Sequence, residues 1–311
     1  MKPGQIRRVL VALRPRQRGL PAAADHARVL AERFGADLTV MSAVYDSSVA
    51  LGASRGNARS AAARDGIVEA EKASLERLAS SLRDWGIAVE TDVRWHAPTH
   101  EAVLQVVSEK HVDLLVVDAL ESQPAVHTRL TDADWQLMRR CPCPLLFVND
   151  PEFASYDTIL AAVDPLHPGP ATERTDAAVL STAAAFARAF GAQLRVLHVY
   201  PDPEVYSWVS SIEVSPGVFL GAENIEAFHR QAVEALVSSL RIGADRVDLR
   251  PGDPRVAIAD AAADCHAGLV VLGALARGEI EQALLGSTAE AIAAEADCDV
   301  LLVKPAPAVA V

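Results

Sequence analysis

The residues best suited to chemistry follow an apolar run in the last quarter of the chain. Leu269–Leu272 lead to Gly273, and after a loop Gly286 precedes Ser287 and Thr288 at the start of a predicted helix. Glycines let backbone N–H groups approach an anion closely, and a helix N-terminus carries about half a positive charge. The two hydroxyls can donate to phosphate oxygens or cap the helix. The pattern is typical of a phosphate-binding loop, and it also suits an ordinary turn followed by a helix cap.

The loop between the two glycines contains a cation but no lysine. Arg277 is placed to meet a polyphosphate tail, and Gly278 follows it directly. Rapid P-loop ATPases hold phosphates with a Gly-Lys-[Ser/Thr] sequence, which is missing from this loop. A Ser–His–Asp order, paired carboxylates or clustered metal ligands do not stand out elsewhere in the chain. We therefore expect no catalytic residues, and at most slow ATP hydrolysis.

The strand that leads into this loop has a second copy earlier in the chain. Leu114–Ala119 returns as Leu269–Ala274, and Cys143–Val148 returns as Cys298–Val303, each 155 residues later. A nearly constant offset between several matching segments is the mark of an internal repeat. The sequence therefore predicts a duplicated domain.

Both copies, which we place at residues 1–150 and 151–311, alternate short Val, Leu and Ile runs with longer Ala-rich stretches of helical period. The predicted strands are 7–13, 36–45, 87–95, 113–118, 144–149, 157–163, 192–200, 245–250, 268–273 and 299–304. The predicted helices are 20–34, 60–84, 98–110, 131–140, 172–190, 222–241, 253–266 and 286–296. Strands that are apolar at every position are typical of parallel sheets covered on both faces. We predict an α/β fold with a doubly wound, mainly parallel five-stranded sheet in each copy.

Composition limits the partners that the protein can have. The formal net charge of −12 argues against nucleic acid, whose backbone needs a cationic surface. No apolar run approaches the roughly 18–20 residues that would span a bilayer, so we expect no membrane association. Because a strand-like segment starts soon after Met1, a signal peptide is not expected, and the predicted location is cytoplasmic.

The span from Gly273 to Ser287 resembles the signature Gly-x2-Gly-x9-Gly-[Ser/Thr] of the universal stress protein family. The wider chain resembles the tandem, E-type members of that family. Other segments support the resemblance: Trp95-His96-Ala97-Pro98, Thr131-Asp132-Ala133-Asp134-Trp135, Arg139-Arg140-Cys141-Pro142 and Leu285-Gly286-Ser287-Thr288-Ala289-Glu290. The resemblance covers nearly the whole chain. It implies two tandem domains with a fold like that of the adenine nucleotide alpha-hydrolases.

The resemblance also implies a nucleotide site in the second copy. Asp164 takes the position that contacts adenine, and Gly252-Asp253-Pro254 resembles the turn beside the ribose. Gly273, Gly286 and Ser287 take the positions that hold the phosphates of ATP, bound alone or with Mg²⁺. Ala276 departs from the signature because a glycine belongs there, which adds one methyl group near the phosphates.

The first copy departs much further at the matching positions. Asp118, Glu121 and Asp132 stand where Gly273, Ala276 and Ser287 stand in the second copy, and Arg14 replaces Asp164. Like charges in one cleft repel each other unless a cation intervenes. We therefore expect no ATP in the first copy and at most one nucleotide per chain.

Histidines and cysteines give weaker indications. His198 ends an apolar strand on the adenine side of the proposed cleft, and lines the pocket or belongs to the core. His96 and His100 have a spacing that can ligate metal on a helix, but Pro98 interrupts it, so no metal site is expected. All four cysteines are interpreted as small buried apolar residues.

Two features concern loops and assembly. Segments 47–59 and 201–221, rich in glycine with serine or proline, each follow the second strand of a copy, and we interpret them as irregular lids over the sheet. The last strands, Leu145–Val148 and Val300–Val303, are apolar enough to require partners. We expect the two copies to pair through them as an intramolecular pseudo-dimer, with a homodimer of the full chain as a further option.

The main functional hypothesis is a stress-response protein that binds ATP in its second copy and acts as a sensor or adaptor for an unidentified protein partner. One alternative is a scaffold without nucleotide that binds an apolar or lipid-like metabolite. A slow ATP hydrolase is the third option.

Overall fold

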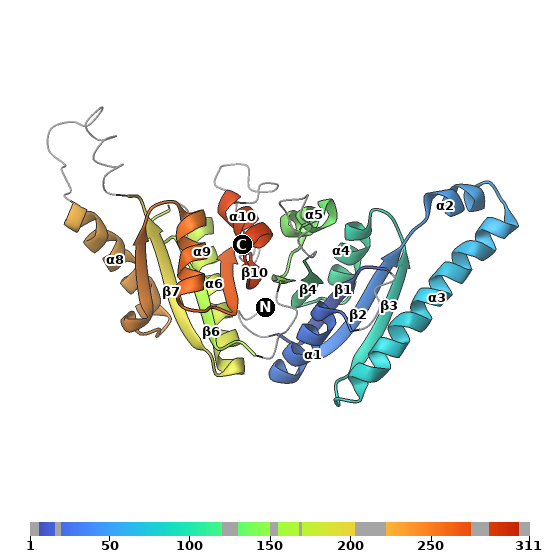
Figure 1. The fold of residues 1–311 in the computed structure, drawn as a ribbon, viewed down its shortest axis with the longest axis horizontal. Helices are drawn as coiled ribbons and strands as arrows, with labels where there is room; N and C mark the ends of the chain where they lie inside the picture. The colour runs from blue at the N-terminus through green and yellow to red at the C-terminus, as the bar shows by residue number, and fades with distance from the viewer. Residues whose placement is uncertain are drawn as a thin grey trace, which may run out of the picture. The chain divides into compact units, whose positions relative to one another are not determined.

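The computed structural model describes residues 6–15, 20–119, 130–149, 155–167, 170–202, 222–274 and 286–304. The chain divides into two units, Ile6–Ala154 and the part from Ser155 onward, and each is described by itself. Figure 1 shows the first unit in blue to green and the second in yellow to red.

The first unit is a five-stranded sheet in which neighbouring strands run parallel. Its strands follow the order β3-β2-β1-β4-β5. They are β1 (Arg8–Leu13), β2 (Asp37–Val44), β3 (Val89–Trp95), β4 (Leu114–Asp118) and β5 (Leu145–Val148). The helices are α1 (Ala22–Phe34), α2 (Ser47–Ser54), α3 (Ala58–Arg83), α4 (Thr99–Glu109) and α5 (Asp132–Arg140).

The second unit repeats this topology. Its strand order, β8-β7-β6-β9-β10, matches the order β3-β2-β1-β4-β5 of the first unit strand by strand. Its neighbouring strands are also parallel. The strands are β6 (Thr158–Ala162), β7 (Gln193–Tyr200), β8 (Val247–Pro251), β9 (Leu269–Gly273) and β10 (Asp299–Val303). The helices are α6 (Pro170–Phe190), α8 (Ala222–Ser239), α9 (Pro254–Asp264) and α10 (Ser287–Glu295), with a 3₁₀ turn at Ala244–Arg246. The predicted fold class and the repeat are confirmed.

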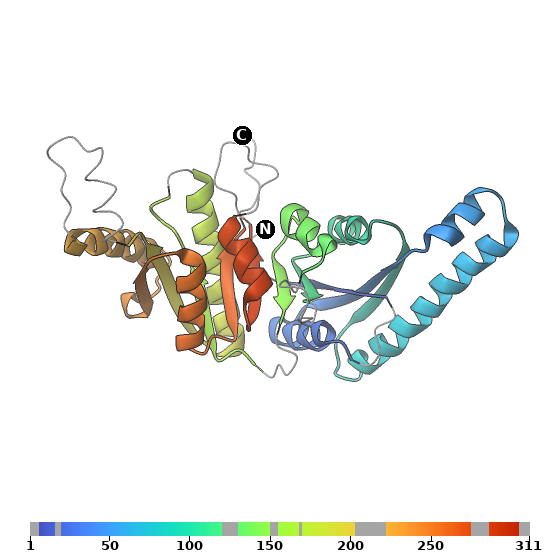
Figure 2. The same cartoon turned by 45° about the horizontal axis from the view of Figure 1, so that its top comes forward.

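The strand order determines where a ligand site can form. The connections from β1 to β2 and β3 step one way across the sheet, and the connection from β4 to β5 steps the other way. Right-handed crossovers therefore place α1 and α3 on one face and α4 and α5 on the other; Figures 1 and 2 allow these helices to be followed. The direction changes between β1 and β4, and between β6 and β9 in the second unit. The carboxyl ends of those strands are where open α/β sheets bind ligands.

The central strands have the burial that their sequences predict. Leu114–Val117 and Leu269–Leu272 are each buried at every position, as strands covered on both faces must be. The second unit adds an aromatic cluster in which the ring centroids of Tyr156 and Phe190 lie 4.9 Å apart. The Tyr156 hydroxyl donates a 2.6 Å hydrogen bond to the buried carboxylate of Asp299, which ties the start of β6 to β10.

Two predictions of local structure need correction. Segment 47–59 is largely helical rather than irregular: α2 begins after Asp46, whose side chain accepts from the N–H groups of Ser48 and Val49. Asn57 caps α3 in the same way, so these two caps outweigh the glycine and serine content. Of the other predicted lid, residues 203–221 lie outside the described residues. Cys265 and Cys298 are half-buried, and only Cys141 and Cys143 are fully buried.

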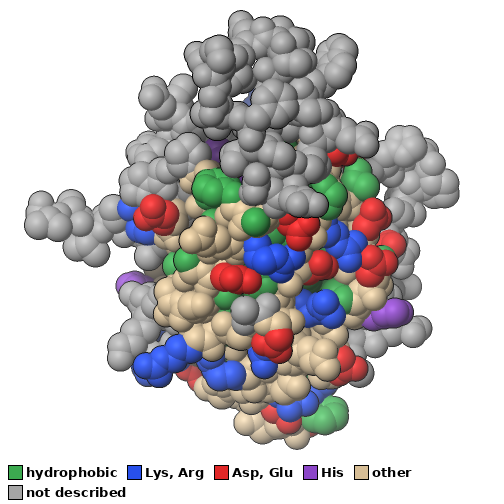
Figure 3. All heavy atoms as spheres, turned by 90° about the vertical axis from the view of Figure 1, so that its left-hand side faces the viewer, with side chains coloured by type: hydrophobic (Ala, Val, Ile, Leu, Met, Phe, Trp, Pro, Cys, Tyr) green, Lys and Arg blue, Asp and Glu red, His purple; other side chains and the backbone are tan. Residues whose placement is uncertain are grey.

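Charges of both signs lie on the surface of the second unit. Figure 3, which views the molecule from the α8 side of Figure 1, shows basic and acidic side chains interspersed. Exposed pairs of this kind, such as Arg230–Glu226 at 2.8 Å, contribute at most about 1 kcal/mol. The stability of this unit therefore rests on its core. Among the described helices, none is both long and apolar enough to cross a membrane.

Candidate functional site

In the second unit, Asp164 lies just after β6 and Gly273 ends β9, on either side of the point where the direction of the connections reverses. A side chain at Gly273 would place its Cβ 2.5 Å from the Cγ2 of Thr175 in α6, which is closer than Cβ atoms approach other atoms. Thr175 is buried, so it has little freedom to move. The requirement for glycine here comes from helix α6 passing over the end of β9.

A pair of histidines lies beside Asp164. His198 in β7 is 1% exposed, and its Nδ1 lies 3.0 Å from the carbonyl oxygen of Val163. Because a carbonyl only accepts hydrogen bonds, Nδ1 carries the proton and the Nε2 of a neutral His198 is an acceptor. His229 in α8 places its Nδ1 2.7 Å from that Nε2 and donates to it. The hydrogen-bond chain leaves Nε2 of His229 as an acceptor.

Burial and the neighbouring His198 lower the pKa of His229, in that order, against the opposing effect of the Asp164 charge. His229 is therefore neutral at pH 7. Its ring stacks on His198 with centroids 4.9 Å apart and packs beside Tyr200 at 5.4 Å. The Asp164 carboxylate lies 4.0 Å from Nδ1 of His198. The predicted residue His198 is thus a core histidine that orients His229.

Asp176 in α6 is a buried carboxylate at this end of the sheet. It is 5% exposed, and its Oδ1 accepts a 3.2 Å hydrogen bond from the backbone N–H of Asp164. Its Oδ2 is buried and has no hydrogen-bond partner in the described structure. Burial, with a smaller contribution from the Asp164 charge, raises the pKa of Asp176 to about 7. This carboxyl group therefore changes charge near neutral pH.

The predicted Gly252-Asp253-Pro254 turn lies at the same edge of the sheet. Gly252 has φ of 115°, which favours glycine, and its N–H donates a 2.9 Å hydrogen bond to the carbonyl of Tyr200 at the end of β7. Asp253 caps α9 by accepting from the N–H of Arg255, and Pro254 occupies the first turn of that helix. The turn is therefore held beside the strand that carries His198.

At the predicted phosphate positions, Gly286 is the N-cap of α10, and no side chain in the described part of the chain makes a cap hydrogen bond to this helix. Ser287 and Thr288 form its first turn, and Gly286 has an extended conformation with φ of −68° and ψ of 132°. The glycine is therefore not required by its backbone angles. Arg277 and Gly278 lie outside the described residues.

In the first unit, the residues at the matching positions bond to other groups of the same unit. Nη2 of Arg14 lies 3.1 Å from the carbonyl oxygen of Asp118 and 3.2 Å from Oδ2 of Asp134. Asp134 is buried and also accepts from Thr131, with which it forms a capping box on α5. Oδ1 of Asp118 accepts a 2.6 Å hydrogen bond from the N–H of Ala23, in the first turn of α1.

The predicted cluster of carboxylates in the first unit has a cation beside it. Arg14 bonds to the carbonyl oxygen of Asp118 and pairs with Asp134, a carboxylate that the predicted cluster did not include. Glu121 lies outside the described residues. In the first unit, the place that corresponds to Asp164 and Gly273 of the second contains an internal ion pair and a carboxylate at a helix N-terminus.

Sequence reasoning missed His229 and Asp176. His229 lies 31 residues from His198, and its role depends on how α8 packs on β7, for which the sequence has no motif. Asp176 is one of several acidic residues in the chain around α6, and only burial distinguishes it. Among the described residues, no group of three or more His, Cys, Asp or Glu side chains is arranged to hold a metal.

A tandem pair of doubly wound sheets, with a glycine-flanked helix N-terminus in the second, defines a class of two-domain α/β proteins. The model of the universal stress protein family matches residues 5–149 and again 155–304. The chain belongs to the universal stress protein family and carries two copies of its domain.

Similar proteins extend over nearly the whole chain. Universal stress protein E of Escherichia coli K12 is 27% identical over 298 residues, covering 96% of this chain and 93% of the relative. The universal stress protein E homolog of Haemophilus influenzae is 24% identical and covers 97% and 98% of the two chains. The crystal structure of a protein of unknown function from Pseudomonas aeruginosa PAO1 is 25% identical, with a TM-score of 0.73 over 97% of this chain and 94% of its own.

Proposed function

We propose that the second unit of this stress-response protein binds one adenine nucleotide, ATP alone or with Mg²⁺, and that the protein acts as a sensor or adaptor for a protein partner. The observation that supports this most is the convergence of Asp164, the His198–His229 pair and the Gly252 turn at the carboxyl ends of β6, β7 and β8. These groups are far apart in the sequence, and the fold brings them to one edge of the sheet.

The chemistry of these groups suits the base and sugar end of a nucleotide. The exocyclic amino group of adenine donates hydrogen bonds, and both the Asp164 carboxylate and Nε2 of His229 accept them. Gly252, with a positive φ, makes the turn that follows the neighbouring strand β8. Acceptors alone would repel phosphates, so the phosphate groups belong at the other end of the site.

The N-terminus of α10 suits the phosphates. It has no side-chain cap, and its first turn offers backbone N–H groups together with the hydroxyls of Ser287 and Thr288. In the first unit, the carboxylate of Asp118 already sits at the first turn of α1, and Arg14 is paired with Asp134. We therefore expect one nucleotide per chain.

The test is calorimetric titration of the full chain with ATP, on the wild type and two variants at one position. Gly286→Asp and Gly286→Asn both supply a good helix cap of nearly equal size, but only the first adds a negative charge. Loss of charge-assisted hydrogen bonds costs roughly 1.5–3 kcal/mol each, so Gly286→Asp should weaken binding by at least about tenfold more than Gly286→Asn.

Asp132→Gly in the first unit is the control and should leave a stoichiometry of one. Two sites in the wild type, or equal affinity in Gly286→Asp and Gly286→Asn, would contradict the proposal.

The two other candidates have their own readouts. A slow hydrolase would form ADP over hours in the same samples. A scaffold for an apolar metabolite is favoured by one observation, a leucine-lined pocket in the first unit, and native mass spectrometry of the freshly purified protein would show what co-purifies.

A further inference from the structure

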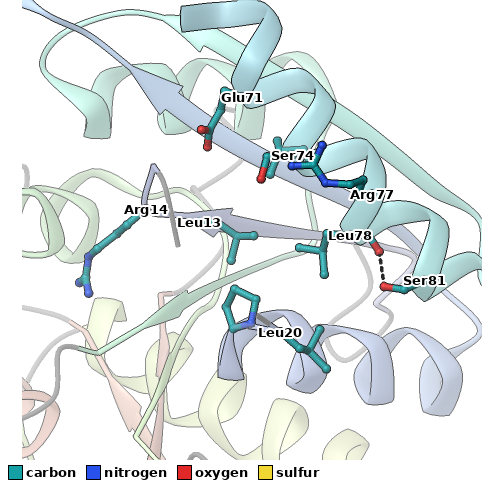
Figure 4. Close-up of a pocket in the computed structure, with 10 residues that line it drawn as sticks. Leu13, Arg14, Leu20, Glu71, Ser74, Arg77, Leu78 and Ser81 are labelled. Carbon is teal, nitrogen blue, oxygen red and sulfur yellow. Dashed lines mark hydrogen bonds between the residues drawn. The ribbon is translucent and has the colours of Figure 1, made fainter. Parts of the chain in front are cut away.

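The first unit contains a pocket of about 440 Å³ that opens at the carboxyl end of β1. Its walls come from the end of β1, the residues just before α1 and the C-terminal half of α3 (Figure 4). Leu13, Leu20, Leu75 and Leu78 make much of the wall apolar. A volume of this size lies within the range of small-molecule sites, roughly 300–1,000 Å³.

One charged side chain is buried in the wall of this pocket. Glu71, in α3, is 8% exposed and points toward the space between β1 and α3 (Figure 4). It makes no hydrogen bond or ion pair with any residue in the described ranges. Its carboxylate oxygens are not among the fully buried polar atoms, so what exposure the residue has is at the pocket, where the carboxylate can meet a ligand.

The other buried carboxylates of this unit are satisfied. Asp113 accepts from the N–H groups of Arg7 and Arg8 at 2.9 and 3.0 Å. Asp134 accepts from Thr131 and pairs with Arg14. Glu71 therefore differs from Asp113 and Asp134 in having no partner among the described residues.

The helix around Glu71 does not supply a cation. Side chains three and four residues apart are neighbours on a helix, and at those distances from Glu71 stand Ile67, Val68, Ser74 and Leu75. Lys72 points elsewhere and pairs with Glu69 at 2.7 Å. Arg14 lines the pocket but is committed to Asp134, and Arg77 is an exposed residue at the pocket.

We propose that this pocket binds a small molecule with an apolar body and a primary ammonium group. Glu71 accepts hydrogen bonds from the ammonium, and the Ser74 hydroxyl, one turn along the same helix, accepts another. The leucines contact the apolar body. The site is independent of the nucleotide site because it lies in the other unit and shares no residue with it.

The test uses three probes of equal length, n-hexylamine, 1-hexanol and hexanoate, titrated into the full-length protein at pH 7 and followed by NMR. The amine should bind about tenfold more tightly than the alcohol, because a charge-assisted hydrogen bond replaces a neutral one. Hexanoate should be rejected by the Glu71 charge. Glu71→Gln, which keeps the shape of the side chain, should abolish the preference for the amine.

Glu69→Gln is the matched control, since it removes an exposed carboxylate two residues away on the same helix. It should leave the preference unchanged. Equal binding of the three probes, a preference for hexanoate, or an amine preference that persists in Glu71→Gln would each overturn the proposal.

The melting temperature gives a second, independent readout. If Glu71 has no partner in the free protein, Glu71→Gln should melt at the wild-type temperature or above it. A fall of several degrees would mean that the chain itself supplies a partner for Glu71, and the proposal would then be wrong.

Discussion

Asp176→Asn should stabilise the second unit at neutral pH, with a dependence on pH that the buried carboxyl group determines. The pKa of Asp176 is raised from 3.8 to about 7, chiefly by burial. Between those two pH values the folded protein holds a proton on this group and the unfolded chain does not. The wild type therefore loses stability as pH rises from about 4 to about 7, and stays at the lower level above that.

The magnitude follows from the same two values. The interval spans roughly three pH units, and each is worth 1.36 kcal/mol, so the ionised form destabilises the wild type by up to about 4 kcal/mol. The amide of Asn keeps an oxygen to accept from the Asp164 N–H, but it brings N–H donors to the place where Oδ2 has no partner. An unpaired buried donor costs about 1–3 kcal/mol, which leaves a net gain of about 1–3 kcal/mol at pH 8.

Urea unfolding of the full chain at pH 8 and pH 4 measures the difference between Asp176→Asn and the wild type. Comparing the two proteins at each pH cancels the groups that titrate in both. The gain should be close to its full value at pH 8 and should disappear or become a small loss at pH 4. Asp260→Asn, an exposed acid on α9, is the control and should show no gain at either pH. A gain that is equal at both pH values, or a loss at pH 8, would refute this account of Asp176.

Three further predictions concern other parts of the chain. Gly273→Ala should destabilise the second unit by about 1–3 kcal/mol in urea unfolding, because its methyl group meets Thr175; an unchanged midpoint would mean that α6 yields without cost. Arg14→Met should destabilise the first unit by about 3–5 kcal/mol, since Asp134 is left buried without its cation, and this loss should shrink when Asp134→Asn is added. Residues 151–311 expressed alone should dimerise or precipitate, because the apolar strand β10 pairs with β9 along one edge and would lose the predicted pairing with the other copy along its second edge; a monodisperse monomer in light scattering would contradict this.

Much of the fold could be predicted because its signals are local. The apolar runs at β4 and β9, and the Ala-rich helices between strands, place almost every described element within about two residues of its expected bounds. Segment 47–59 was the exception, because its glycines and serines suggest a loop while Asp46 and Asn57 act as helix caps. Capping residues are short-range signals too, and they identify both helix starts correctly.

The site was harder to predict because it depends on contacts between distant segments. Asp164 and the Gly252 turn follow strands and could be placed, whereas His229 and Asp176 acquire their properties only from packing and burial. In the first unit, the sequence shows several acids near one arginine but not which of them meet. The hydrogen bonds of Arg14 to Asp134 and to the Asp118 carbonyl decide that.

In the first unit, the Arg14–Asp134 pair and the Asp118 carboxylate are parts of the chain that occupy the place where a ligand would otherwise bind. A group that is part of the chain is always at the same effective concentration, so the stability that it confers does not follow the nucleotide supply of the cell. A dissociable ligand stabilises its domain by RT ln(1 + [L]/Kd), which rises with every increase in concentration above Kd. If the second unit binds a nucleotide as proposed, its stability varies with the nucleotide concentration, whereas the stability of the first unit does not. In a calorimeter, added ATP should shift the melting of the second unit alone, and the distance between the two transitions would then read out the nucleotide concentration.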